Sequence, residues 1–184
     1  MTRPGQVDWD PMAALFASTR LCLPLVLFAV ATTPGTAQRA FGQFGAGGGL
    51  GAEYASGASG NGVFPAAAVG FGLAWSNVLV RADVRGFATK SEPLVTFGLA
   101  VGVPLVRSER ARVYAFGAGG TGLFVEEGDP AHHVGAGVGL TTSHPTGVFV
   151  ELRYDYLVGT FTYAQRQRSL GSLIAGLRFG PRRF

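Results

Sequence analysis

The sequence has very little of three things that define common classes of protein. Only one of its 184 residues is cysteine, and Cys22 lies near the N-terminus, so the rest of the chain can form no disulfide and no cysteine metal site. Charged residues make up 14%, well below the roughly 25% typical of soluble domains. No apolar run reaches the roughly 20 residues that a membrane-spanning helix needs. A chain this poor in charge either crosses a membrane with strands or is an unusual soluble protein.

The N-terminal region has the features of an export signal. Arg20 precedes an apolar run of 11 residues that ends at Ala31, which suits the hydrophobic region of a signal peptide. Small residues then lead to Ala37, after which we predict cleavage. Residues 1–37 are therefore predicted to be a signal peptide and residues 38–184 the exported domain, with Met12 as an alternative start that the sequence leaves open.

The net charge of +4 raises the question of a nucleic-acid partner. The basic residues are scattered or lie beside turns, and no motif of DNA or RNA recognition accompanies them. We therefore predict no nucleic-acid partner, and an anionic lipid surface fits these residues better.

Segments of two-residue hydrophobic periodicity recur along the exported part of the chain. Eight such strands are predicted, at residues 41–54, 63–75, 78–88, 94–106, 111–125, 132–142, 147–159 and 170–180. Tight turns alternate with longer polar connections, and the longer ones are predicted at residues 55–62, 88–93, 125–132 and 160–168. This alternation is typical of a barrel with short turns at one rim and long loops at the other. A soluble up-and-down barrel stays open as an alternative.

The stretch VFVELRYDYLVG, residues 148–159, shows how the two faces of a strand differ. Val150, Leu152 and Tyr154 share one face, and charged residues occupy the other. Strands 41–54, 63–75 and 94–106 likewise carry bulky apolar residues on one face and glycine or alanine on the other. A soluble sandwich would then expose glycine and alanine with almost no charge. We predict instead that the bulky faces contact lipid and the small or charged faces line a narrow barrel.

Aromatic residues lie near many of the predicted strand ends, as they do in the interfacial girdles of membrane barrels. The girdles are predicted to contain Tyr54, Phe64, Trp75, Phe87, Phe124, Tyr156 and Phe161.

Over residues 38–184 the chain resembles the eight-stranded bacterial outer-membrane β-barrels of the OmpA/OmpX type. The resemblance includes the last strand, where Leu173, Leu177 and Phe179 share a face like that of the family's C-terminal assembly signal, and the chain ends in the aromatic Phe184. It implies an all-β, eight-stranded, antiparallel, up-and-down transmembrane barrel in the bacterial outer membrane. The implied partners are outer-membrane lipids, lipopolysaccharide and the outer-membrane assembly machinery, and the implied state is a monomer.

The inward faces carry a set of charges that we predict to cluster in the lumen. Its members are Glu53, Arg81, Asp83, Arg85, Glu151, Arg153, Asp155 and Arg178. Because unpaired buried charges are costly, the main hypothesis is a plug of ion pairs in a barrel with a structural or surface-interaction role. Closure of the barrel would put the first and last strands side by side, so that Glu53 and Arg178 are either close neighbours or at different heights. A narrow pore for small solutes is the alternative, and an active site is a third.

Other candidate sites are weaker. Some barrels of this family are lipid A deacylases with a His/Ser/Glu set, and His133 could be a base with Thr121 as the nearest hydroxyl, but no serine completes the set. His132 and His133 are therefore predicted to be solvated at a loop edge. The acidic residues Glu126, Glu127 and Asp129 are interpreted as a polar loop tip, with Ca²⁺ binding as an alternative. We predict no enzyme activity, no cofactor and no metal site.

Overall fold

The computed structural model of the protein describes residues 39–55, 58–75, 77–89, 93–125, 130–160 and 165–180, and for residues 52–55, 58–61, 158–160 and 165–168 it gives the backbone alone. The predicted signal peptide lies outside the described residues, so its cleavage site stays a prediction. No helix in the described ranges has the length and apolar character needed to cross a bilayer.

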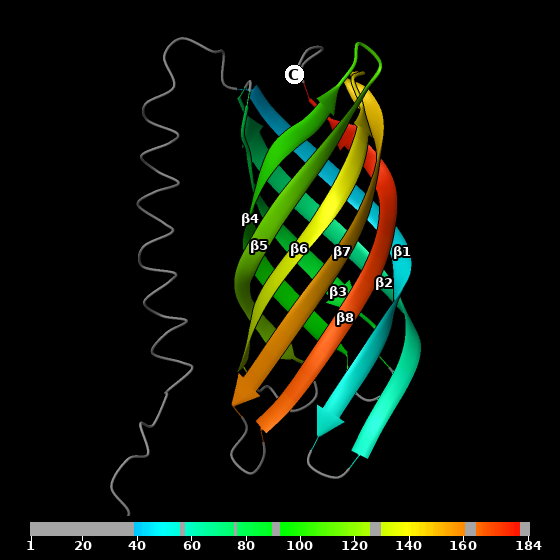
Figure 1. The fold of residues 1–184 in the computed structure, drawn as a ribbon, viewed down its shortest axis with the longest axis vertical. Helices are drawn as coiled ribbons and strands as arrows, with labels where there is room; N and C mark the ends of the chain where they lie inside the picture. Colours follow the sequence, from blue (N-terminus) through cyan, green and yellow to red (C-terminus); the bar gives the residue numbers. More distant parts are fainter. Residues whose placement is uncertain are drawn as a thin grey trace, which may run out of the picture. The chain divides into compact units, whose positions relative to one another are not determined.

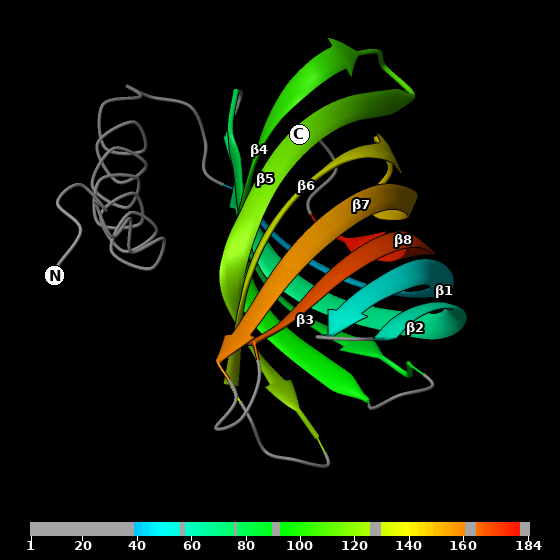
Figure 2. The same cartoon turned by 60° about the horizontal axis from the view of Figure 1, so that its bottom comes forward.

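Eight antiparallel strands form a closed barrel in which each strand pairs with the next and β8 pairs with β1 (Figures 1 and 2). The strands are β1 (Arg39–Ala55), β2 (Ala58–Ala74), β3 (Leu79–Phe87), β4 (Leu94–Arg107), β5 (Ala111–Phe124), β6 (Pro130–Thr142), β7 (Thr146–Thr160) and β8 (Gln165–Phe179). The predicted eight-stranded, antiparallel, up-and-down fold is confirmed.

Tight turns join alternate pairs of strands at one rim. The amide of Trp75 donates to the carbonyl oxygen of Val78 at 2.8 Å, and the amide of Ser108 donates to that of Ala111 at 2.9 Å. Figure 1 shows this rim at the top, where β1 begins and β8 ends. We call it the short-turn rim, and the opposite end, where β3 leads to β4 and β5 to β6, the long-loop rim.

Two of the predicted long loops are largely strand. β1 extends to Ala55 and β2 starts at Ala58, so residues 58–62 pair with β1, and β8 starts at Gln165 rather than at residue 170. The glycine, serine and asparagine content of these segments favours turns locally. Ladder hydrogen bonds need no particular side chain, so two neighbouring strands can prolong each other past their apolar pattern.

The outward face of the barrel is apolar on all eight strands. Leu152 and Tyr154 are each 55% exposed, whereas Glu151, Arg153 and Asp155 are each 1% exposed, which confirms the predicted orientation of β7. The large exposed apolar residues include Phe44, Leu50, Val63, Phe71, Val84, Phe97, Leu99, Leu123, Val134, Val148, Leu152 and Leu173. An apolar surface that runs around a whole molecule is typical of contact with lipid.

Inward-facing glycines make room for aromatic rings inside this narrow barrel. A Cβ placed on Gly49 would lie 2.7 Å from Cζ of Phe64, and one placed on Gly45 would lie 2.9 Å from Cζ of Phe149. Both distances are far shorter than a normal carbon–carbon contact of about 3.5–4.0 Å. The glycines of β1 therefore allow large rings to fill the lumen.

We expect Gly49→Ala to destabilise the barrel by about 1–3 kcal/mol, because the added methyl overpacks the ring of Phe64 and the backbone of β8. Gly86→Ala is the matched control, since a Cβ at Gly86 meets no atom within 4 Å. Urea unfolding in detergent micelles, followed by tryptophan fluorescence, measures both. Equal stability of the two variants would contradict this account of the glycines.

Candidate functional site: the charged lumen

The charged side chains in the barrel come mainly from two strands on opposite sides of it. β3 and β7 are four strands apart in the closed sheet, and on each the charged residues alternate with outward residues. Because successive side chains in a strand point to opposite faces, all six charges point inward. The inward set is Arg81, Asp83, Arg85, Glu151, Arg153 and Asp155, each at most 5% exposed. Contacts between these strands therefore cross the lumen.

Glu151 is the hub of the network. Its Oε1 accepts hydrogen bonds from Arg81 Nη1, from the Tyr114 hydroxyl at 2.6 Å and from Gln43 Nε2 at 3.4 Å. Its Oε2 accepts from Arg85 Nη2 at 2.7 Å and Arg81 Nη2 at 3.1 Å. Three other strands, β1, β3 and β5, thus supply donors to one carboxylate of β7.

Asp83 and Asp155 extend the network toward the long-loop rim. Asp83 Oδ2 accepts from Arg81 Nη2 at 3.0 Å and from Arg153 Nη1 at 3.2 Å. Arg153 also contacts Asp155 Oδ1 through Nε at 2.8 Å and Nη2 at 2.6 Å. Charge-assisted pairs of this kind are the strong hydrogen bonds of proteins. The six residues form one connected bridge from wall to wall.

Arg178 differs from the other lumen arginines in its partners. Its Nε and Nη2 donate to Gln43 Oε1 at 3.1 and 2.6 Å, and Nη2 donates to the Tyr114 hydroxyl at 3.2 Å. Its guanidinium carbon lies 4.6 Å from the ring centroid of Phe41. These partners are neutral, so Arg178 joins the network through hydrogen bonds and ring contacts.

Of the two arrangements left open for Glu53 and Arg178, the structure shows the one in which they lie at different heights of the barrel. In the β1–β8 register Arg178 is opposite Gln43, and Glu53 is opposite Arg168, at the other end of the pair. The side chain of Glu53 lies outside the described residues. Among the buried lumen side chains that the structure describes, four arginines face three carboxylates.

His133 lies in the lumen and not at a loop edge, which corrects the sequence prediction. It is 4% exposed, and its Nδ1 lies 3.4 Å from Asp155 Oδ1 and 3.3 Å from Arg153 Nη2. Strand β6 starts at Pro130, two residues earlier than predicted, and His133 falls on its inward face. Thr121 is exposed on the outward face, so the hydroxyl proposed to accompany His133 points away from it.

A layer of apolar side chains fills the lumen toward the long-loop rim. Phe64, Phe87 and Phe124 are each at most 2% exposed, so their assignment to an interfacial girdle is wrong. The rings of Phe64 and Phe87 meet edge to face, with centroids 5.8 Å apart. The same buried cluster includes Ala66, Ala68, Leu94, Ala131, Phe149, Leu157, Leu170 and Ile174. We call Phe64, Phe87, Leu94, Phe124, Leu157 and Leu170 the apolar layer.

The other proposed girdle residues divide into two groups. Trp75 and Tyr156 are partly exposed at the barrel wall, and the side chains of Tyr54 and Phe161 lie outside the described residues.

The residues of the predicted assembly signal lie on the outward face of β8. Leu173 is 53% exposed, Leu177 39% and Phe179 41%, and the ring of Phe179 stacks on that of Phe44 at 5.7 Å. Phe184 lies outside the described residues. The recognition of these residues by assembly machinery stays a prediction.

Within the described ranges, no three His, Cys, Asp or Glu side chains are grouped so that they could hold a metal ion. The lumen carboxylates are instead surrounded by arginine donors. Glu126, Glu127 and Asp129, for which Ca²⁺ binding was an alternative, lie outside the described residues.

The structure of this chain is similar to solved structures of other β-barrel proteins. The barrel is similar to Neisserial surface protein A (NspA), with a TM-score of 0.53 and 18% sequence identity, over 76% of this chain and 96% of NspA. It also matches Ail, the attachment invasion locus protein of Yersinia pestis, in complex with the heparin analogue sucrose octasulfate (TM-score 0.45, 14% identity, 76% and 99% coverage). A third match is the outer membrane protease OmpT from Escherichia coli (TM-score 0.32, 11% identity, 82% and 99% coverage).

No protein-family model matches the sequence, and no curated protein matches it significantly. The similarity to NspA therefore establishes a shared fold.

Proposed function

We propose that this chain, which has the fold of the eight-stranded bacterial outer-membrane β-barrels, is an integral protein of that membrane with a closed lumen and a structural or surface-interaction role. Its partners are then the lipids around it, lipopolysaccharide at the long-loop rim, and the machinery that assembles it. The observation that carries the closed lumen is the bridge from Arg81 and Arg85 on β3 to Glu151 on β7.

The outward surface supports the membrane location. Apolar side chains that are half exposed or more, such as Phe44, Phe71 and Leu152, would contact water in a soluble protein. At about 25 cal/mol per Å² of apolar area, exposure of such a belt to water would be strongly unfavourable.

Two successive obstacles support a closed lumen. The charge network crosses the barrel from β3 to β7, and the apolar layer lies beyond it toward the long-loop rim. An ion on its way through would have to displace paired arginines and carboxylates and then pass closely packed aromatic rings. Both steps are costly, since the first leaves buried charges without partners and the second strips the ion of water.

A narrow pore is the second candidate, and one observation favours it. Arg85 Nη1, Asp155 Oδ2 and Ser172 Oγ are buried polar atoms without a hydrogen-bond partner among the described residues. Such atoms are usually satisfied by water. Water in this part of the lumen would shorten the distance that a solute must cross without water. The apolar layer would still lie between this water and the long-loop rim.

The surroundings of His133 favour a role without catalysis. Its ring contacts Arg153 and Asp155 inside the barrel, and its Nε2 lies 3.4 Å from the carbonyl oxygen of Phe97. A general base must reach the proton it abstracts, and these neighbours leave the ring enclosed.

Planar-bilayer recording tests the closed lumen. We expect the wild-type protein, shown to be folded by its heat-modifiable gel mobility, to produce no steady conductance above that of the bare bilayer. Combining Arg85→Ala with Phe87→Ala removes part of both obstacles and should produce measurable conductance. Val84→Ala, which shortens an outward side chain of the same strand, should not. Large and steady wild-type channels would overturn the proposal and favour the pore.

A further inference from the structure

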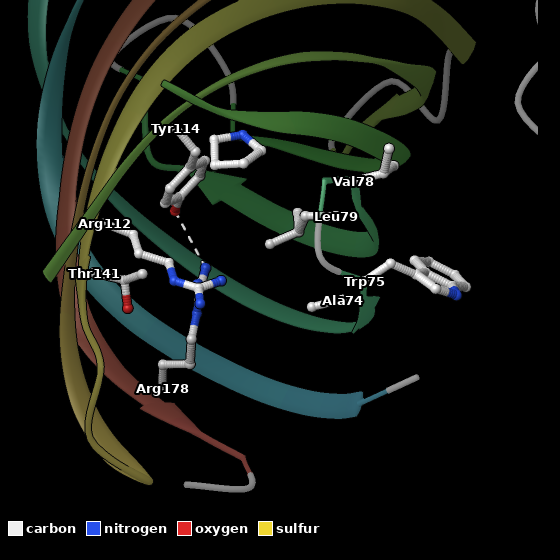
Figure 3. A pocket seen from close by; sticks show the side chains of 9 residues that line it. Ala74, Trp75, Val78, Leu79, Arg112, Tyr114, Thr141 and Arg178 are labelled. Carbon is white, nitrogen blue, oxygen red and sulfur yellow. Dashed lines mark hydrogen bonds between the residues drawn. The ribbon is translucent and has the colours of Figure 1, made fainter. Parts of the chain in front are cut away.

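A small pocket opens at the short-turn rim, at the end of the lumen opposite the apolar layer. Its cavity volume is about 30 Å³, and Figure 3 shows the side chains that line it. They come from the ends of six strands and from the turn between β2 and β3, and include Leu79, Arg112, Tyr114, Thr141 and Arg178. The space holds about two to three oxygen atoms, because a single water needs roughly 10–15 Å³ on this measure.

The polar groups of the pocket are cationic or hydroxylic. Arg112 and Arg178 both point into it, and the Tyr114 hydroxyl lies 3.2 Å from Arg178 Nη2 (Figure 3). Thr141 adds a second hydroxyl, and none of the lining residues is a carboxylate. Arg178 is 3% exposed. The Tyr114 O–H donates to Glu151 Oε1 at 2.6 Å, and the Thr141 O–H donates to the carbonyl oxygen of Thr142 at 3.4 Å. The two guanidinium groups are therefore the donors in this pocket that match oxyanion binding in proteins.

Positive charge also surrounds the mouth of the pocket. Arg39 and Arg107 lie close enough to Arg112 for their charges to act on it. Along the described strand ends and turns of this rim (residues 39–44, 72–75, 77–79, 103–115, 138–148 and 175–180) one carboxylate, Glu109, is present. It is exposed in the turn between β4 and β5. The rim therefore attracts anions toward the pocket.

The charge count inside the barrel points the same way. Three carboxylates face four arginines among the buried lumen side chains that the structure describes, and Arg178 is the one of these four whose polar partners are neutral. A buried charge is costly unless it is paired, and an anion in the pocket would pair with Arg178.

We propose that the pocket at the short-turn rim binds the terminal oxygens of a phosphate-type oxyanion, held by the guanidinium groups of Arg112 and Arg178. The cavity is too small for a whole ligand, so the anion enters by its oxygens and the rest of it lies in the mouth. Free inorganic phosphate and the phosphate of an anionic lipid headgroup share this chemistry. The site does not depend on whether the lumen conducts.

Calorimetric titration of inorganic phosphate into the folded barrel, in a phosphate-free maltoside detergent, tests the site. We expect saturable binding by the wild type. Arg112→Gln should weaken it by about tenfold or more, since a hydrogen bond to a charged group contributes on that scale. Arg178→Lys keeps the charge but loses the planar fork, and should weaken binding without unfolding the barrel.

Arg110→Gln is the matched control, because Arg110 is exposed in the turn at the same rim but does not line the cavity. It should change affinity by no more than about twofold, as screened surface charges do. Equal losses in the Arg110 and Arg112 variants would overturn the site, because they would show diffuse attraction to the rim. Absence of saturable phosphate binding to the wild type would also overturn it.

Doping the micelles with phosphatidylglycerol or with phosphatidylcholine distinguishes the two sources of the anion. If phosphatidylglycerol displaces phosphate from the wild type, and phosphatidylcholine does not, the site takes a lipid headgroup. If neither lipid competes while phosphate binding still depends on Arg112, the site takes a free anion. Competition by phosphatidylglycerol that persists in Arg112→Gln would place the lipid elsewhere and contradict the lipid arm of the proposal.

Discussion

Glu151→Gln should lower the free energy of unfolding by about 3–5 kcal/mol, because it removes the negative charge that pairs with two buried arginines. The change keeps the size of the side chain, so the loss comes from electrostatics and not from a cavity. Arg81 and Arg85 would then share Asp83, which already accepts from Arg153. The amide nitrogen of the new glutamine would also bring an N–H donor against the N–H groups of the arginines, which need an acceptor. Among the lumen side chains that the structure describes, Glu151 accepts the most hydrogen bonds.

Urea unfolding of the folded barrel in micelles measures this effect. Glu109→Gln is the matched control, since it removes the same charge from an exposed turn of the same chain, and it should leave stability unchanged. Equal free energies of unfolding for Glu151→Gln and Glu109→Gln would mean that water, rather than Glu151, satisfies the arginines. That result would contradict the account in which ion pairs stabilise the lumen charges.

Leu152→Arg should destabilise the inserted barrel by about 2–4 kcal/mol, because the charge would face lipid near the middle of the bilayer. Leu152 is 55% exposed on β7, between the inward Glu151 and Arg153, so the cost does not come from the lumen. The measurement is the folded fraction after refolding into lipid vesicles at a series of urea concentrations, read from heat-modifiable mobility.

His144→Arg is the control for charge alone, because His144 is exposed in the short turn before β7. It should fold as the wild type does. If Leu152→Arg folds as well as His144→Arg, the outward face of β7 contacts water. The interpretation as a soluble barrel would then replace the interpretation as a membrane protein.

The strand faces were predictable from sequence because the side-chain period of a strand is two. In β7 the alternation of Leu152 and Tyr154 with Glu151, Arg153 and Asp155 identifies the strand and both of its faces. The small inward residues of β4, such as Gly98 and Ala100, likewise indicate a narrow barrel, because its lumen has no room for large side chains on the inward face of every strand. The closed sheet follows from eight such strands and the alternation of turn lengths.

The apolar layer was not predicted because a phenylalanine near a strand end suits either an interfacial girdle or a lumen plug. The alternation of faces along a strand distinguishes a girdle from a plug. Phe87 lies two residues from the inward Arg85, and Phe64 lies two residues from the inward Ala66, so both rings point inward. That signal was available in the sequence. For His133 the error was to treat the first residues of the predicted strand 132–142 as a loop edge, although a histidine within a strand has a defined face.

The partners of Arg178 could not be predicted, because they depend on how far β8 slides along β1. The observed register places Arg178 opposite Gln43 and brings it to Tyr114, whereas a shift along the pair would have brought it toward Glu53. Shifts by an even number of residues leave the inward and outward faces of both strands unchanged, so the hydrophobic pattern does not distinguish them. The same holds for contacts across the lumen between β3 and β7, which depend on the heights of strands that are not neighbours.

Single-cysteine labelling of neighbouring positions in β4 tests the central claim, a lipid-facing wall around a closed lumen, most directly. Leu99 is 49% exposed and Ala100 is fully buried. In vesicles, with Cys22 replaced if it is retained, Leu99→Cys should react with a lipid-soluble maleimide and not with a charged, membrane-impermeant one. Ala100→Cys should react with neither until the barrel is unfolded. Rapid labelling of Leu99→Cys by the charged reagent would contradict the membrane location, and rapid labelling of Ala100→Cys by it would contradict the closed lumen.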